Sequence, residues 1–144
     1  MGIKMKSTYK IKIGSKVYMM DSKVRVLIVE DQESIQIMLS KDLRKIGLES
    51  DIHCCDRIED AMNIIKERKL DIIFLDLNLK NGDKGMDLLK SLKKRRSTLP
   101  VVIISSEDDI KFIIDAIEEG AVEFIVKPWN KKVLVQKISF SLAA

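Results

Sequence analysis

Short apolar runs alternate along this chain with stretches whose apolar residues recur at helical spacing. The runs, several of them rich in Val and Ile, predict strands, and the periodic stretches predict helices. The predicted strands are Val24–Val29, Glu49–Cys54, Asp71–Leu75, Val101–Ile104 and Val122–Val126. The predicted helices are Gln32–Ile46, Asp56–Arg68, Gly85–Leu92, a segment from Ser106 to about Gly120, and Asn130–Leu142.

The predicted strands are almost continuously apolar, which indicates a parallel sheet covered on both faces. Right-handed crossovers between such strands produce a doubly wound α/β fold. Local signals support the helix boundaries. Asp56 with Glu59 predicts a capping box, Ser106 with Asp109 predicts a second cap, and Gly47 is expected to end the first helix.

Residues 1–22 depart from this alternation. Lys10–Ile13 and Lys16–Met19 flank Gly14–Ser15, and a glycine-first pair suits the two-residue turn of a β-hairpin. An isolated hairpin is marginal in water, so we expect a mobile basic tail over residues 1–22. The folded domain is expected to span residues 23–144.

The positive charge of the chain is concentrated in that tail. The formal net charge is +4, but residues 1–23 hold six lysines and one aspartate, while the remainder holds 20 basic and 21 acidic residues. The domain is therefore near neutral, and its composition does not favour direct nucleic-acid binding. We interpret the cluster Lys93–Arg96 as a solvated helix end, where cations suit the helix dipole.

The two cysteines, Cys54 and Cys55, are adjacent and lack metal-ligand spacing. Because adjacent cysteines seldom pair, we expect reduced thiols and hence a cytoplasmic protein. No apolar run approaches the roughly 18 residues that a membrane span requires. The N-terminal lysines are not followed by the apolar core of a signal peptide, so no membrane partner is expected.

Polar residues follow four of the predicted strands. Glu30–Asp31 follow the first, Asp76 the third, Ser105–Ser106 the fourth and Lys127 the fifth, with Asn78 two residues beyond Asp76. Open parallel sheets bind ligands at the carboxyl ends of their strands, where these groups would meet. Taken singly, a strand-end Asp is usually a helix cap and a Lys before Pro is usually a surface residue. The whole set of strand-end residues indicates a functional site more specifically than any one of them does.

The chemistry of this set narrows its use. Clustered carboxylates require a cation or a proton at neutral pH. Oxygen ligands without His or Cys favour Mg²⁺, which often takes one or two carboxylates plus a phosphate. A lysine and a hydroxyl at the same edge suit phosphate oxygens, and a carboxylate is a possible nucleophile for phosphoryl transfer.

Four segments carry a family resemblance: the acidic pair in VLIVEDQ, the aspartate in IIFLDLN, the hydroxyl in PVVIISS and the lysine in FIVKPW. On these residues the sequence resembles the receiver domain of bacterial two-component response regulators, of the chemotaxis-regulator-like type. The resemblance covers roughly Lys23 to Leu142. It implies a flavodoxin-like fold with five parallel strands in the order 2-1-3-4-5. It further implies a signalling switch rather than an enzyme.

The resemblance also implies a role for each site residue. Asp76 would be the phosphoacceptor, and Mg²⁺ would be held by Glu30 (mainly through water), Asp31, Asp76 and the backbone carbonyl of Asn78. Ser105 and Lys127 would bind the phosphoryl group. Ser105 and Phe124 would form the switch, because movement of the hydroxyl opens space that the ring can fill.

The expected partner is a sensor histidine kinase or a phosphotransfer protein, whose phosphohistidine is the donor. The face formed by Asp108–Glu119, the fifth strand and Asn130–Leu142 is expected to serve dimerisation or partner binding. Two positions depart from the family pattern. Lys80 stands where a proline is common, and Gly85 lies nine residues beyond Asp76 rather than about eight, so the loop Leu79–Lys84 is one residue longer.

Alternatives remain at this stage. The chain is either a stand-alone relay protein or a receiver from a larger regulator or hybrid kinase. A Mg²⁺-dependent phosphatase with an aspartate nucleophile would usually need a second acid where Asn78 stands. A nucleotide- or flavin-binding module would need a glycine-rich turn after the first strand, which the sequence lacks.

Overall fold

A five-stranded parallel sheet forms the centre of the chain, with strands in the order β4-β3-β5-β6-β7. The computed structural model describes residues 8–13, 15–21, 24–46, 48, 51–106 and 110–143. The strands are β1 Thr8–Ile13, β2 Lys16–Asp21, β3 Arg25–Val29, β4 Asp51–Cys55, β5 Ile72–Asp76, β6 Val101–Ser106 and β7 Glu123–Lys127. The helices are α1 Glu33–Lys45, α2 Ile58–Glu67, α3 Gly85–Lys94, α4 Ile110–Glu118 and α5 Lys131–Ala143.

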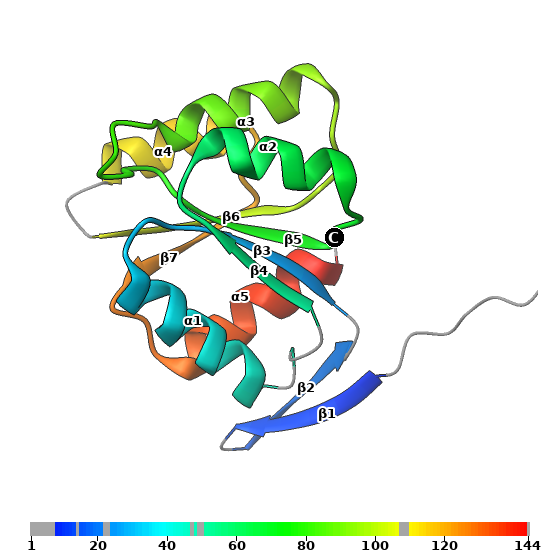
Figure 1. The fold of residues 1–144 in the computed structure, drawn as a ribbon. Coiled ribbons are helices and arrows are strands. Elements are labelled where there is room, and N and C mark those ends of the chain that lie inside the picture. Colours follow the sequence, from blue (N-terminus) through cyan, green and yellow to red (C-terminus); the bar gives the residue numbers. More distant parts are fainter. Residues whose placement is uncertain are drawn as a thin grey trace, which may run out of the picture.

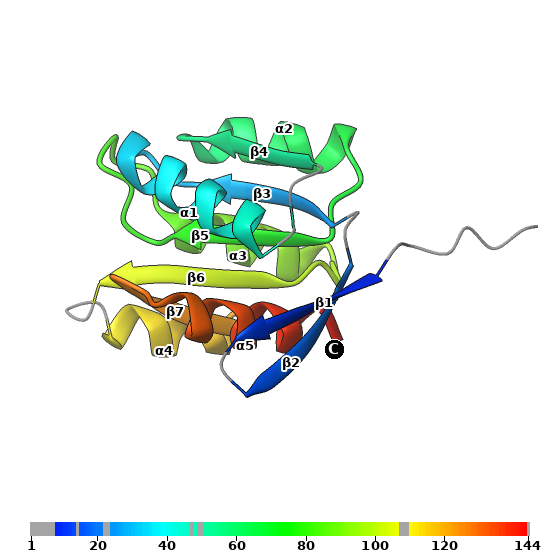
Figure 2. The ribbon, with the colours of Figure 1, turned by 90° about the horizontal axis from the view of Figure 1, so that it is seen from below.

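The helices cover both faces of this sheet: α1 and α5 lie on one side, and α2, α3 and α4 on the other (Figures 1 and 2). Counted within the five-stranded sheet, the order is 2-1-3-4-5, so the predicted doubly wound, flavodoxin-like fold is confirmed. The predicted strands and helices match the observed ones to within a few residues.

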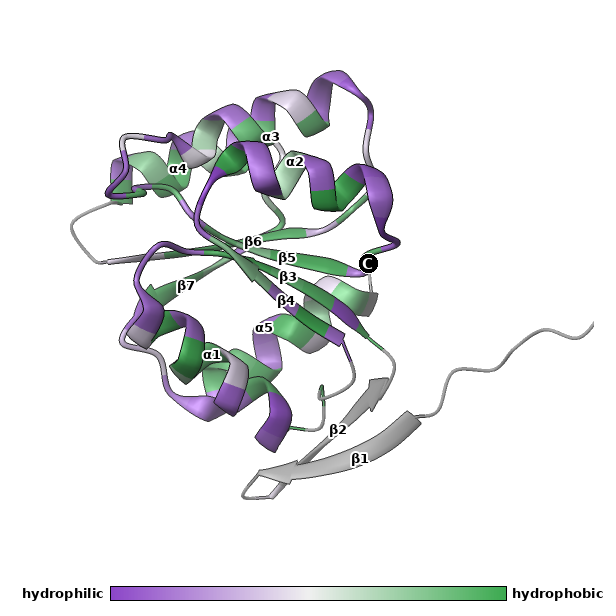
Figure 3. Cartoon of the chain, in the orientation of Figure 1, coloured by the Kyte–Doolittle hydropathy of each residue, from purple (hydrophilic) through white to green (hydrophobic). Residues whose placement is uncertain are grey.

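Alternation along the strands divides the core into two clusters. Val26 and Ile28 of β3 pack with α1 and α5, whereas Leu27 and Val29 pack with α2 and α3. Figure 3 shows the result as hydrophobic strands of the five-stranded sheet between helices that carry both hydrophobic and hydrophilic residues. Full burial of a large aliphatic side chain contributes about 1.5–3 kcal/mol, so these two clusters account for much of the driving force for folding.

One predicted cap is wrong. The N-cap of α2 is Arg57, not Asp56, and no side chain within the segment caps the helix. Instead, the Ile58 N–H donates to Asp83 Oδ2 at 2.9 Å. A carboxylate from the loop after β5 therefore performs the capping that a local Asp was expected to perform.

The other boundary signals have mixed outcomes. Ser106 is the last residue of β6, while its expected capping partner Asp109 lies outside the described residues. Gly47 also lies outside them. Gly120 follows α4 with φ of +105°, a left-handed conformation that favours glycine at a helix end. At the start of α5, Asn130 Oδ1 accepts from the Val133 N–H at 2.8 Å.

The N-terminal hairpin is present. Strands β1 and β2 pair antiparallel with Ile13 opposite Lys16, which leaves a two-residue connection. β2, the strand of the hairpin nearer to the domain in Figure 1, contacts α5, so the hairpin packs against that helix. The mobility expected for residues 1–22, and the domain boundary at residue 23, stay predictions.

Candidate functional site

An open pocket of about 380 Å³ lies at the carboxyl edge of the sheet. Three strand ends supply the acidic groups and the lysine at this edge, because β3 leads into Glu30 and Asp31, β5 ends at Asp76, and β7 ends at Lys127. The pocket is lined by Asp31, Gln32, Asp76, Asn78, Lys80, Ser106 and Lys127. The sheet order thus brings together residues that are up to 97 positions apart in the sequence.

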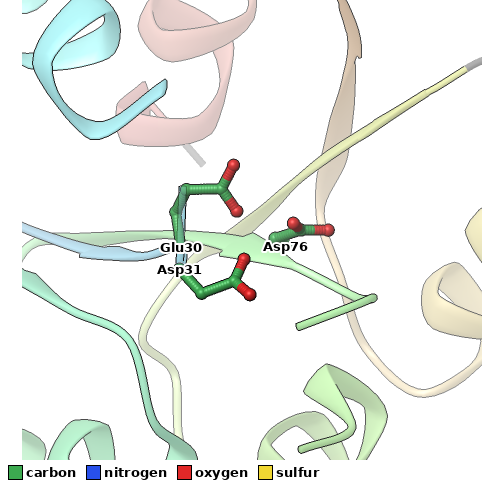
Figure 4. Close-up of side chains that lie close together, drawn as sticks. All are labelled: Glu30, Asp31 and Asp76. Carbon is green, nitrogen blue, oxygen red and sulfur yellow. The ribbon is translucent and has the colours of Figure 1, made fainter. Parts of the chain in front are cut away.

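Three carboxylates gather at this edge. Glu30, Asp31 and Asp76 each present an oxygen such that the three atoms lie within 4.8 Å of one another. Figure 4 shows the three side chains together at the ends of their strands. Glu30 is only 2% exposed and Asp76 only 6%. Such proximity among buried like charges is unfavourable unless a cation or a proton compensates it.

Lys127 supplies part of that compensation. Its Nζ lies 2.9 Å from Glu30 Oε1 and 3.3 Å from Asp76 Oδ2. Burial by itself lowers the pKa of the Lys127 ammonium, but the bond to Glu30 and the charge of Asp76 outweigh it, and the pKa lies above its usual value. The lysine is therefore cationic at neutral pH and lies between two carboxylates.

One ammonium does not fully balance the cluster. Burial, together with the neighbouring Asp76 carboxylate, raises the pKa of Glu30 to about 8, despite the lowering effect of Lys127. A buried carboxyl group with such a raised pKa indicates an unmet need for positive charge.

The donor set fits a hard divalent cation. Among the described residues, Glu30 Oε2 and Asp31 Oδ1 are buried and have no hydrogen-bond partner. These two oxygens belong to the acidic cluster, in which the candidate ligands are all oxygen atoms and include no sulfur or imidazole nitrogen. That chemistry suits Mg²⁺ better than zinc or copper.

Hydrogen bonds orient the acidic residues. The Asn78 N–H donates to Asp76 Oδ1 at 3.0 Å. The Lys80 N–H donates to Asp31 Oδ2, and the Gln36 side-chain amide donates to the backbone carbonyl of Glu30. These bonds hold the three acidic residues in place, and Asp31 and Asp76 line the pocket.

The two serines at the end of β6 occupy different places. Ser106 lines the pocket, whereas Ser105 is 1% exposed. Strand alternation puts Ser105 on the same face as Ile103, which packs with α3 and α4. Phe124 packs against that same cluster, so Ser105 and Phe124 share a face of the sheet. Lys137 Nζ lies 4.2 Å from the centroid of the Phe124 ring.

The loop after β5 explains why a glycine stands at residue 85. A Cβ there would lie 2.6 Å from the Asp76 carbonyl oxygen and 2.8 Å from Leu77 Cα, both backbone atoms. The Gly85 N–H also donates to the Leu77 carbonyl at 3.1 Å. The absence of a side chain at Gly85 thus lets α3 begin directly against the segment that carries Asp76.

Sequence reasoning missed three contributors to this site, one of which is Lys80, whose N–H donates to Asp31. Gln32 lines the pocket, and Gln36 holds the Glu30 backbone. The signal for Gln32 was its place directly after Glu30–Asp31. For Gln36, only the first-turn position on the predicted helix pointed toward the strand end.

The strand order and the acidic, lysine-bearing pocket define a flavodoxin-like α/β domain with its functional edge at the ends of β3, β5 and β7. A family model for the response regulator receiver domain matches residues 26–139. The chain therefore belongs to the response regulator receiver domain family, as the sequence motifs predicted.

Known response regulators are similar to this chain in sequence and in structure. A putative NtrX-like response regulator of Rickettsia felis is 33% identical over 115 residues, which is 79% of this chain and 24% of that protein. The crystal structure of the receiver domain of NtrX from Brucella abortus aligns with a TM-score of 0.76 at 29% identity, over 83% of this chain and 98% of that one. The crystal structure of a putative response regulator from Chloroflexus aurantiacus aligns with a TM-score of 0.77 at 27% identity. The alignment covers 85% of this chain and 99% of that one.

The chain spans about a quarter of the length of the curated relatives it matches, 24% in each of the NtrX-like proteins of Rickettsia. The matched part is a receiver, a signalling module of two-component systems. Within the part of the chain that the structure describes, no helix has the length and apolar character needed to cross a membrane.

Proposed function

We propose that this domain is a phosphorylation switch that accepts a phosphoryl group on Asp76. The observation that carries the proposal is the arrangement of the Asp76 carboxylate 3.3 Å from Lys127 Nζ and within 4.8 Å of oxygens from Glu30 and Asp31. A nucleophilic carboxylate beside a fixed cation and two further acids is what phosphoryl transfer to aspartate requires.

In this mechanism a carboxylate oxygen of Asp76 attacks phosphorus, and the bond between phosphorus and the imidazole nitrogen of a phosphohistidine breaks. The imidazole leaves with the electron pair, and the product is an acyl phosphate on Asp76. The Lys127 ammonium pairs with the phosphoryl oxygens. The donor is a histidine kinase or a phosphotransfer protein of a phosphorelay. On this proposal the domain is a switch and not an enzyme that turns over a phosphate ester.

The Mg²⁺ site would be formed by the carboxylates of Asp31 and Asp76 and the backbone carbonyl of Asn78, with Glu30 acting mainly through water. Bound there, the cation would neutralise charge on the phosphoryl group during transfer. Asp31 Oδ1 and Glu30 Oε2, which are buried and have no hydrogen-bond partner in the described part of the chain, support this assignment.

The output would involve Ser105 and Phe124. The acyl phosphate adds acceptor oxygens and charge, which draws the Ser105 hydroxyl toward it. Because Ser105 and Phe124 share one face of the sheet, displacement of the first changes the space available to the second. The change would be presented along α4, β7 and α5.

A second copy of the domain is the partner we propose for that face. Ile110, Ile114 and Ile117 of α4 and Phe140 of α5 are exposed apolar side chains, 67%, 57%, 43% and 65% accessible. A two-fold axis would bury the same patch of both copies. Sedimentation velocity with and without beryllium fluoride, which mimics the phosphoryl group, should show a dimer only with it. The Ile114→Glu variant should remain monomeric.

We also propose that this switch acts in the cytoplasm, which the free, adjacent cysteines and the kinase donor support. The central test is intact-mass spectrometry after incubation with acetyl phosphate and Mg²⁺. The expected result is a labile gain of one phosphoryl group, about 80 Da, that is absent in Asp76→Asn and prevented by EDTA. No gain in mass under any of these conditions would contradict the proposal. Steady turnover of a generic phosphate ester would favour the phosphatase alternative.

A further inference from the structure

The loop between β5 and α3 makes direct contact with Asp31. The Lys80 backbone N–H donates to Asp31 Oδ2, and Lys80 lines the same pocket as Asp31 and Asp76. The other oxygen of that carboxylate, Oδ1, is buried and has no hydrogen-bond partner among the described residues. One oxygen of Asp31 is thus held by the loop, while the other remains available as a ligand.

Two further bonds fix this loop in place. Asn81 Nδ2 donates to the Asp56 carbonyl at 2.6 Å, and Asp83 Oδ2 accepts from the Ile58 N–H at 2.9 Å. The Asp83 N–H also donates to Asn81 Oδ1 at 2.9 Å. The loop is therefore anchored to the start of α2, and its Lys80 N–H has a defined position relative to the end of β3.

We propose that Lys80 is a positioning residue of the metal site and that it acts through its backbone N–H rather than its ammonium. The N–H orients the Asp31 carboxylate so that Oδ1 is presented to the cation. This inference rests on the proposed function, in which Asp31 is a Mg²⁺ ligand. A proline, common at this position in the family, has no N–H and could not make the bond.

The physical benefit is preorganisation. A carboxylate that is already held in its binding rotamer loses less side-chain entropy when it binds a cation. Groups that orient a metal ligand are typically worth roughly 10- to 100-fold in metal affinity. The Lys80 bond thus makes a measurable contribution to Mg²⁺ binding although Lys80 itself need not touch the ion.

The test compares two substitutions at this position. Lys80→Pro removes the N–H and the charge, whereas Lys80→Gln removes only the charge. Isothermal titration with MgCl₂ should show a Kd raised about 10-fold or more in Lys80→Pro and within about twofold of the wild type in Lys80→Gln. Equal affinity in the proline variant and the wild type, equal weakening in both variants, or no Mg²⁺ binding by the wild type would each overturn the proposal.

A second measurement does not depend on how well the proline variant folds. In the wild type, the Lys80 amide proton should be protected from hydrogen exchange and shifted downfield in ¹⁵N-resolved spectra. Both features should be lost in Asp31→Ala. An amide that exchanges equally fast in both proteins would overturn the inference. If the wild type binds Mg²⁺ but Asp76 takes no phosphoryl group, the proposed function fails and the Lys80 comparison still decides the inference.

Discussion

The Trp129 indole N–H donates to Asp42 Oδ2 at 2.8 Å. This bond joins α1 to the segment that follows β7, two residues beyond Lys127. Trp129 also packs against the core cluster formed by α1, α5 and the sheet. The strand end that carries the pocket lysine is therefore held from the side of α1 as well as by its own sheet.

Asp42→Ala should lower the free energy of unfolding by about 1.5–3 kcal/mol, because the bond to a charged acceptor is lost and a half-buried N–H loses its partner. Asp42→Asn keeps an oxygen acceptor, so its free energy of unfolding should fall by clearly less than that of Asp42→Ala. Urea titrations followed by far-UV circular dichroism provide the comparison. Trp129 is the only tryptophan of the chain, so a red shift of its emission should accompany the alanine change. Equal stability of the two variants would show that the bond contributes little.

Lys127 should contribute to stability as well as to the site. Lys127→Gln leaves Glu30, which is 2% exposed, beside Asp76 without its ammonium. Removing one partner of a buried pair typically costs 3–5 kcal/mol. We expect about 1–3 kcal/mol here, because a carboxyl group with a raised pKa can take up a proton instead.

Lys137→Gln is the matched control for that loss. It breaks the 3.0 Å pair with Glu123, in which both side chains are about a quarter exposed, and should cost under about 1 kcal/mol. Thermal unfolding of the two variants at low salt makes the comparison. A smaller effect at Lys127 than at Lys137 would contradict the proposed role of burial.

The start of α2 offers a third prediction. Asp83→Ala removes the acceptor of the Ile58 N–H and should destabilise the domain by about 1 kcal/mol, as loss of a helix cap does. Asp56→Ala should change stability by less than about 0.5 kcal/mol, because the Asp56 side chain does not cap the helix and its backbone carbonyl is retained. If urea unfolding showed that Asp56→Ala is the less stable of the two variants, the helix would be capped by the local Asp56 rather than by Asp83.

This contrast shows which parts of the fold could be predicted from the sequence. Strands and helices follow from hydrophobic period, which is local, and their alternation determined the fold class. The cap of α2 joins residues 25 positions apart and depends on the shape of the loop after β5. Asp56 with Glu59 satisfied the sequence pattern of a capping box, but a more favourable partner from another loop took its place.

The site divides in the same way. Glu30, Asp31, Asp76 and Lys127 could be predicted because each directly follows or ends a strand, and parallel strands bring their ends to one edge. The bond from Lys80 to Asp31 spans 49 positions and uses a backbone N–H, which no side-chain pattern reveals. The sequence likewise offered two adjacent hydroxyls at β6, and only the structure distinguishes the buried Ser105 from Ser106 in the pocket lining.

Gly85 should not tolerate a side chain. In Gly85→Ala, the new Cβ would meet backbone atoms of Asp76 and Leu77 at under 3 Å, and neither atom can rotate away. Overpacking of this kind costs about 1–3 kcal/mol, which outweighs the roughly 0.5–1 kcal/mol that alanine gains within a helix. Lys90→Ala on the exposed side of α3 is the control and should be near neutral. Unchanged thermal stability of Gly85→Ala would show that the loop can shift freely.

The two cysteines should differ in reactivity even though they are neighbours. Burial raises the pKa of both thiols, that of Cys55 to about 12, and Cys54 is the more exposed of the two residues. Since the thiolate is the nucleophile and a raised pKa lowers its fraction, Cys55 should react slowly with iodoacetamide at pH 8, and its rate should still be rising at pH 9. We expect the Cys54→Ser variant to be alkylated about tenfold more slowly than Cys55→Ser. Mass spectrometry over time measures both rates, and in urea they should become equal. Equal rates in the folded proteins would mean that Cys55 is not protected by its position at the end of β4.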